Sequence, residues 1–135
     1  MTQFIKKDLN LIKIALYQPD IPQNTAAIIR LCACLNTELD IIEPCGFIMN
    51  DKRFKRVSMD YIDKCKIKTF LNYKKFEEKH KKERIILMTT RGKIKYHKFR
   101  FKKNDTILFG RESQGVPESV HKSVDKRLVI PIQEK

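Results

Sequence analysis

Short apolar runs alternate with segments of helical spacing along most of this 135-residue chain. The runs at 11–17, 39–43 and 106–109 have the length and the aliphatic content of buried strands. Between the first two runs, the apolar residues of 25–35 recur at the three- and four-residue spacing of a helix. Strands that alternate with helices in this way pair in parallel, because each return to a parallel neighbour needs a long crossover. The sequence therefore predicts an α/β fold with a mostly parallel sheet flanked by helices.

The rest of the chain continues the same alternation. The segment 93–104 is basic, and its pattern predicts no particular form. A chain of this length can bury one core, so we expect a single domain over 1–135, with 1–10 as an N-terminal extension. The further predicted elements are one or two short helices in 50–63, strands at 66–71, 84–90 and 127–131, and helices at 73–82 and 117–123.

Positive charge is concentrated in the middle of the chain. The net charge is +13, and the segment 51–103 holds 20 Lys/Arg against 6 Asp/Glu, whereas the remainder is close to neutral. Such a block favours a polyanionic partner, of which nucleic acid is the commonest. A lysine-rich solvated surface would give the same composition, so charge alone leaves both readings open.

Nothing in the sequence predicts a membrane span, an export signal or a metal site. No apolar run approaches the roughly 20 residues that a spanning helix needs, and 1–10 lacks a long apolar stretch. The four cysteines include no C-x-x-C pair, which argues against zinc and thioredoxin-like sites. We therefore expect reduced thiols, no metal and a cytoplasmic location. The cysteines are Cys32, Cys34, Cys45 and Cys65.

The segment 109–117 follows an apolar run directly and reads Phe-Gly-Arg-Glu-Ser-Gln-Gly-Val-Pro. A strand that ends in glycine brings its backbone close to a ligand at the carboxyl edge of an α/β sheet. Gly115 can adopt positive φ in the turn, and Pro117 suits the first turn of the next helix. Arg111 and Glu112 add a guanidinium and a carboxylate. A plain tight turn would need the same glycines and proline, so the local pattern fits both a ligand loop and a turn.

Three predicted strand ends meet at this edge of the sheet: 88–90, 109–110 and 130–131. Backbone groups from three loops can clasp a planar ring such as adenine. The sequence has no G-x-G-x-x-G and no Walker loop, which disfavours dinucleotide and triphosphate binding in those modes.

Asn24 lies where the loop after the first strand meets the predicted helix 25–35, and Arg30 lies within that helix. Asn24 either caps that helix or belongs to a site. Arg30 has apolar neighbours, and it either faces solvent or is held at the carboxyl edge, where it would contact a phosphate or a hydroxyl. The local sequence leaves these alternatives open.

The three histidines carry no catalytic signal. They stand alone among lysines or on a helix, so we expect surface positions for all of them. They are His80, His97 and His121.

Four segments, taken together in their order and spacing, resemble the SPOUT (trefoil-knot) RNA methyltransferases. Within that superfamily they are most similar to the small tRNA (cytidine/uridine-2′-O)-methyltransferases that modify the wobble nucleotide of leucine tRNAs. The resemblance covers nearly everything after Asn10. The segments are 14–25 with 28–33, 41–47, 51–56 with 60–61, and 109–117.

The resemblance implies a SPOUT-like fold and S-adenosylmethionine as the methyl donor, bound in a bent form against a knotted C-terminal half. It implies that Met88, Gly110 and Ile130 line the pocket for the adenine and ribose of the donor. It also implies a homodimer with tRNA lying across both subunits, and the basic block 51–103 would then contact phosphates.

The same resemblance implies the catalytic roles. Arg30 would help to activate the ribose 2′-hydroxyl, and Asn24 and Glu112 would shape the site around it. A 2′-hydroxyl is a poor nucleophile, so an enzyme must help remove its proton and align it with the sulfonium methyl.

One family motif has no counterpart here. An Arg-Ser-Leu/Met-Asn-Leu-Ser segment opens the final helix of the family, whereas this sequence reads 132–135 after Pro131 and ends. In the family that segment closes the knot, completes the methionine side of the donor pocket and supplies much of the dimer interface. We therefore expect a C-terminally truncated domain, an incomplete knot and a weakly active or inactive product.

Three functions follow as hypotheses. The first is an S-adenosylmethionine-dependent 2′-O-methyltransferase of the wobble nucleotide in leucine tRNA, impaired by the missing motif. The second is a catalytically inactive remnant that still binds tRNA. The third is an adenine-nucleotide-binding module unrelated to RNA.

Overall fold

Seven parallel strands form one sheet in the computed structural model, which describes residues 12–58 and 61–131. Every pairing between these strands is parallel, which confirms the predicted class. The expectations for 1–10 and for the chain after Pro131, the incomplete knot included, fall outside the described residues. The strands are β1 Lys13–Tyr17, β2 Leu39–Ile42, β3 Ile67–Phe70, β4 Ile85–Met88, β5 Ile94–Lys95, β6 Thr106–Phe109 and β7 Lys126–Val129.

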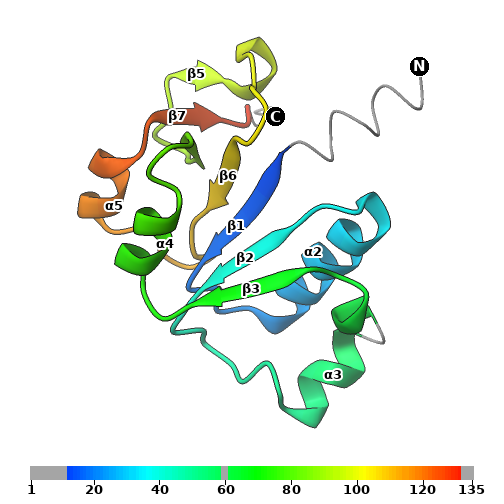
Figure 1. Cartoon of the computed structure of the whole chain (residues 1–135). Helices are drawn as coiled ribbons and strands as arrows, with labels where there is room; N and C mark the ends of the chain where they lie inside the picture. The colour runs from blue at the N-terminus through cyan, green and yellow to red at the C-terminus, as the bar shows by residue number, and fades with distance from the viewer. Residues whose placement is uncertain (1–11, 59–60, 132–135) are drawn as a thin grey trace, which may run out of the picture.

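Helices cover both faces of the sheet, which gives three layers (Figure 1). One face carries α2 (Pro22–Leu35), α3 (Lys52–Ser58) and the short 3₁₀ turn η1 (Tyr61–Asp63). The opposite face carries α4 (Tyr73–Lys79) and α5 (Glu118–Ser123). None of the described helices combines the length and the apolarity that crossing a membrane requires.

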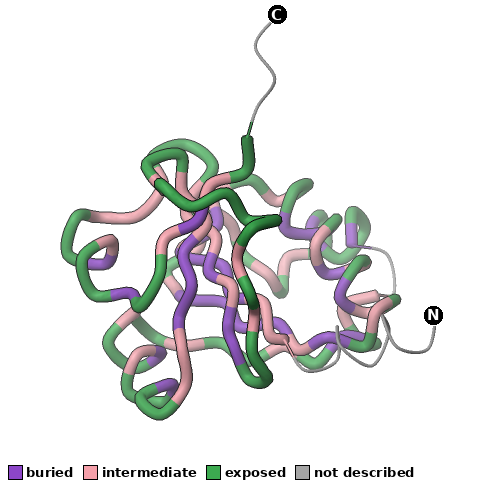
Figure 2. Tube along the Cα trace, turned by 90° about the horizontal axis from the view of Figure 1, so that it is seen from above, coloured by how far each residue is buried: buried purple, intermediate pink, exposed green. Residues whose placement is uncertain are grey.

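The alternation of side chains along β1 explains the two cores. Ala15 and Tyr17 are buried in the cluster under α4 and α5, whereas Leu16 is buried in the cluster under α2 and α3. Successive residues of a strand point to opposite faces, so a strand covered on both sides is mostly apolar. Figure 2 shows this buried trace running through the middle of the molecule, with exposed backbone around it.

The strand order is β3-β2-β1-β6-β4-β7-β5. β2 pairs beside β1, and β3 pairs beside β2 at the edge of the sheet. The chain then crosses to the other half of the sheet, where β4 lies. β6 lies between β1 and β4, although it is distant from β1 in sequence. An open α/β sheet binds ligands at such a switch of direction, at the carboxyl ends of its strands.

Most predicted elements lie within two or three residues of their observed bounds. The segment 93–104, for which the sequence predicts no form, contains β5 and a 3₁₀ turn, η2 (Tyr96–Lys98). A two-residue strand is too short to show periodicity, so tertiary pairing with β7 determines it.

The predicted surface position of His80 is wrong. Only 4% of this residue is exposed, and its Nε2 lies 2.9 Å from Oδ2 of Asp40, which is 3% exposed on β2. His80 caps the carboxyl end of α4, and its ring packs against that of Phe76 in the same helix, with the ring centres 4.5 Å apart. A buried carboxylate needs a hydrogen-bonding partner, and the end of α4 supplies it.

We expect His80→Ala to lower the free energy of unfolding by about 3–5 kcal/mol, because it leaves Asp40 buried without this partner. His97→Ala, the same change at an exposed position, should stay within about 0.5 kcal/mol of the wild type. Urea denaturation of the two variants measures the difference. Equal stabilities would show that the Asp40–His80 pair does not support the fold.

Candidate functional site

The carboxyl ends of β6, β4 and β7 lie side by side. Met88 pairs in register with Phe109 on one side and with Leu128 on the other. Just past the strand end, the backbone N–H of Thr89 donates to the carbonyl of Leu128 at 2.8 Å. The predicted convergence of three strand ends is therefore confirmed.

A cavity of about 500 Å³ opens at this edge, between the end of β4 and the loop after β6. Three of the predicted site residues line it: Met88, Gly110 and Glu112. Its volume lies within the range of roughly 300–1,000 Å³ that small-molecule sites occupy. The walls combine apolar side chains with hydroxyls and backbone groups, and they include Leu87, Phe109 and Val116 with Thr89, Thr90 and Ser113.

The loop 111–115 closes on itself through two backbone hydrogen bonds. The Arg111 N–H donates to the Gly115 carbonyl at 3.1 Å, and the Gly115 N–H donates back at 2.8 Å. Gly115 has φ +65°, which confirms its predicted conformation. A Cβ on Gly110 would lie 2.8 Å from the Cα of Gly115. Each glycine is thus required for its own reason, one by the backbone angle and the other by the close approach of the loop.

Arg111 fastens this loop to the end of β1. Its guanidinium lies 5.5 Å from the centre of the Tyr17 ring, and its Nη1 donates to Oε1 of Gln18 at 3.4 Å. Its Nε also donates to the Gly115 carbonyl at 3.3 Å. This cation therefore holds the cavity wall in place.

Two carboxylates meet at this loop, those of Asp20 and Glu112. The Asp20 N–H donates to Oε2 of Glu112 at 3.3 Å, and the Ser113 hydroxyl donates to Oδ2 of Asp20. Burial raises the pKa of Glu112, and the neighbouring Asp20 side chain raises it further. The Glu112 side chain, followed by the Ser113 hydroxyl, lowers the pKa of Asp20. Of the two carboxyls, Glu112 is therefore the harder to ionise.

The other predicted site residues lie outside this cavity. Asn24 is exposed in the first turn of α2, and the helix cap is Ile21, so the reading of Asn24 as the cap is wrong. Arg30 is half-buried on α2 and forms no ion pair or hydrogen bond with another described side chain. Ile130 follows the end of β7 and is 52% exposed.

Two residues of the cavity wall were missed by sequence reasoning. Arg91 lies three residues after the end of β4, next to the predicted strand end 88–90, so its place in the chain was a usable signal. Its guanidinium pairs with the Glu118 carboxylate at 2.7 Å. His121 reaches the cavity from α5, and burial followed by the charge of Arg91 lowers its pKa. No local pattern marks His121, because the docking of α5 brings it there.

The sequence matches known methyltransferases along nearly its full length. A model of the SpoU rRNA Methylase family matches residues 11–135. A tRNA (cytidine(34)-2′-O)-methyltransferase of Ancylobacter novellus is 47% identical over 125 residues, which are 91% of this chain and 79% of the relative. The protein of the same description from Escherichia coli K12 is 35% identical over 124 residues, which are 90% and 79% of the two chains.

Solved structures agree with the fold. One, described as giving structural insights into the 2-OH methylation of C/U34 on tRNA, has a TM-score of 0.86 and 32% identity, and covers 92% of this chain and 82% of its own. The SpoU methyltransferase AviRb of Streptomyces viridochromogenes, solved with AdoMet, has a TM-score of 0.82 over 93% of this chain and 50% of its own. At 16% identity the second likeness shows the fold alone.

We expect Glu112→Gln to make thermal stability less sensitive to pH. The pKa of Glu112 is raised above its ordinary value of 4.5. Glu112 therefore adds its full share to the free energy of unfolding below pH 4.5, and this share is lost as the pH rises through the raised pKa. The melting temperature of the variant should therefore gain on that of the wild type as the pH rises above 4.5.

Glu118→Gln is the matched control with the opposite sign. Arg91 lowers the pKa of Glu118, so this group stabilises the fold above its ordinary pKa, and the variant should lose stability at neutral pH. Thermal melts across the pH range compare both variants. Parallel curves for Glu112→Gln and the wild type would contradict the raised pKa of Glu112.

Proposed function

The chain belongs to the SpoU rRNA Methylase family, and from this membership we propose that it methylates the ribose 2′-hydroxyl of the wobble nucleotide, position 34, in tRNA. S-adenosylmethionine is the donor in this proposal, and leucine tRNAs are the substrates. The proposal rests on the cavity at the carboxyl edge of the sheet. One wall of that cavity comes from the loop 109–117, which is one of the four segments that carry the resemblance.

The residues around the cavity fit such a donor. Leu87, Met88 and Val116 offer apolar surface to an adenine, and backbone groups beside Gly110 offer hydrogen bonds to its edge. When bound, the donor supplies an electrophilic methyl group on a sulfonium. We assign Ile130 to the rim of the pocket, because it extends from β7, the neighbour of β4.

Arg30 acts on the acceptor in this proposal. Its guanidinium is permanently charged, so it does not take the proton but stabilises the negative charge that develops on the 2′-oxygen as the proton leaves. Its half-buried position without an acidic partner among the described residues supports this role, since its charge is not already neutralised. We assign Asn24 and Glu112 to shaping the site around the ribose.

The surface suits an RNA substrate. The charge excess of 51–103 covers α3, α4 and β5, and net positive charge draws a polyanion to the protein. The four cysteines are free thiols, as suits the cytoplasm, where we place the activity.

A homodimer is part of the proposal, and α2 offers a surface for it. One face of α2 packs on the sheet, whereas Ala27, Leu31 and Cys34, spaced four and three residues apart, are exposed. Leu31 is 57% exposed. An apolar stripe of this kind on an exposed helix face is typical of an interface.

The proposal is tested by methyl transfer from labelled S-adenosylmethionine to a leucine tRNA transcript, with the product mapped at nucleotide 34 by resistance to alkaline cleavage. We expect Arg30→Ala to lower kcat by about 10²–10⁴-fold with little change in donor affinity, because Arg30 acts on the acceptor. Gly110→Ala should instead lose donor affinity in calorimetry, because its Cβ collides with the loop at 2.8 Å.

The same experiment separates the other hypotheses. Binding of tRNA without transfer by the wild type would indicate the inactive tRNA-binding protein. Binding of the donor without any tRNA shift at low salt would indicate an adenine-nucleotide module. An equal kcat for Arg30→Ala and the wild type would remove Arg30 from the proposed site.

We expect Leu31→Lys to halve the mass in sedimentation velocity, because a charge in the apolar stripe of α2 opposes self-association. Leu71→Lys is the control, since Leu71 is 73% exposed and lies outside α2. A dimer that survives Leu31→Lys would place the interface elsewhere.

A further inference from the structure

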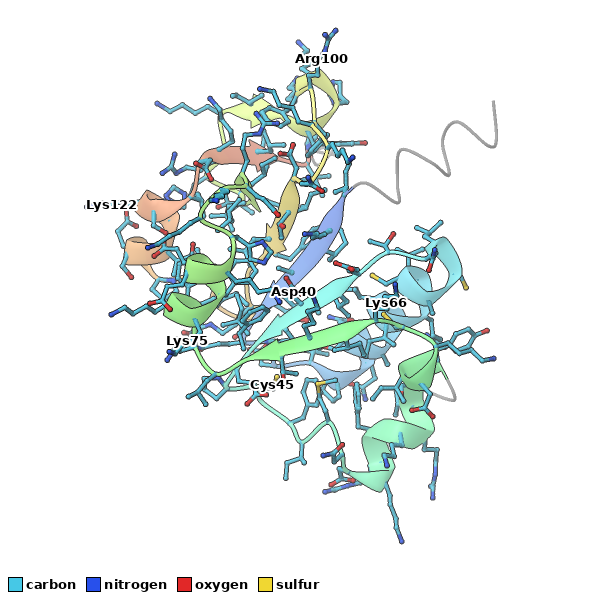
Figure 3. All side chains as sticks on the ribbon, viewed as in Figure 1. Asp40, Cys45, Lys66, Lys75, Arg100 and Lys122 are labelled. Carbon is cyan, nitrogen blue, oxygen red and sulfur yellow. The ribbon has the colours of Figure 1, made fainter. Side chains whose placement is uncertain are left out.

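The segment 93–103, here called the basic-aromatic segment, carries six cations and no acidic residue. Three aromatic residues alternate with these cations, and Figure 3 shows Arg100 at the outer tip of the molecule. The cations are Lys93, Lys95, Lys98, Arg100, Lys102 and Lys103.

Arg84 anchors this segment to the domain. Its guanidinium binds the buried Asp105 through two hydrogen bonds, of 2.9 and 2.6 Å, and donates to the Arg100 carbonyl at 3.3 Å. The same group lies 5.0 Å from the centre of the Phe99 ring, and the Asp105 carboxylate also accepts the Lys102 N–H at 2.6 Å. Arg84 and Asp105 thus neutralise each other, and they hold the segment without using any of its six cations.

Tyr96 is the exposed ring of the segment. It lies on η2 between Lys95 and Lys98 and is 43% exposed. Its nearest aromatic neighbour is His97, edge-on at 5.5 Å, so the ring is not buried by packing. An exposed aromatic ring flanked by cations is the combination on which an unpaired nucleotide stacks while its phosphates are neutralised.

The segment lies close to the proposed donor cavity. Arg91 lines the cavity, and the segment begins two residues later. β5 pairs with β7, with Lys95 in register with Val129 (Figure 1). β7 in turn pairs with β4. Two strand spacings, about 10 Å, therefore separate β5 from the strand that ends at the cavity.

We propose that the basic-aromatic segment holds an unpaired nucleotide of the substrate RNA, with its base stacked on Tyr96 and its phosphates on Lys95 and Lys98. This inference rests on the proposed function and names the surface that presents the RNA to the site. A duplex would meet only the cations, since its bases are already stacked; the exposed ring therefore favours an unpaired segment.

Filter binding of a leucine tRNA anticodon stem-loop tests the surface. Tyr96→Leu should weaken binding about 5- to 100-fold, and Tyr96→Phe should retain it, because stacking needs only the ring. Lys95→Gln with Lys98→Gln should reduce the slope of log K against log salt by about 0.7 per lost phosphate contact.

Lys74→Gln with Lys75→Gln is the matched control, the same charge change on α4. In this control, binding of the stem-loop should still depend on Tyr96. The slope of log K against log salt should change less than in the variant of Lys95 and Lys98. Unchanged affinity for S-adenosylmethionine shows that each variant is folded.

Equal stem-loop affinity for Tyr96→Leu and the wild type, with wobble methylation intact in the wild type, would overturn this inference and leave the proposed function standing. Equal binding of a 12-base-pair RNA duplex, insensitive to Tyr96→Leu, would also overturn it. If the wild type fails to methylate tRNA, an unstructured 12-nucleotide RNA decides: weaker binding by Tyr96→Leu supports the surface, and unchanged binding refutes it.

Discussion

The parallel pairing of β6 with β1 on one side and β4 on the other is the constraint on which the site depends. It brings Phe109 beside both Leu16 and Met88, from strands that are far apart in the sequence. Once β6 is in register, the loop after it reaches Gln18 and Tyr17 through Arg111, and the cavity between that loop and the β4 end is formed. A slip of one residue in β6 would reverse the faces of its side chains and dismantle both cores.

The positive charge of the chain serves two different purposes. Arg111 and Arg84 are structural: each guanidinium lies over an aromatic ring and donates to fixed acceptors. Both prefer arginine over lysine, because a planar fork can stack and donate in several directions at once. The lysines around Tyr96 have no such fixed acceptors among the residues that the structure describes, which leaves them available to a polyanion. A net charge of +13 is therefore a poor guide by itself to which cations bind RNA.

Sequence reasoning succeeded where a residue's role follows from its own backbone or its place in the chain. Gly115 was predicted at positive φ, and the strand ends at Met88 and Phe109 were predicted to meet. It failed where a role depends on the docking of another element. His80 was expected at the surface because it stands among lysines, yet α4 places it over Asp40. His121 was also expected there, and α5 brings it to the cavity wall.

The sequence by itself determined the α/β class, most of the elements and the loop 109–117, because periodicity, strand length and glycine chemistry are local properties. It also carried the family, through motifs whose order and spacing are visible without a structure. Tertiary structure alone decided which side chains meet: the Asp20–Glu112 pair, the Asp40–His80 pair and the anchoring of the segment around Tyr96 by Arg84. These contacts join residues 15 to 92 positions apart, and neither the pairing nor its effect on charge and burial leaves a local signal in the chain.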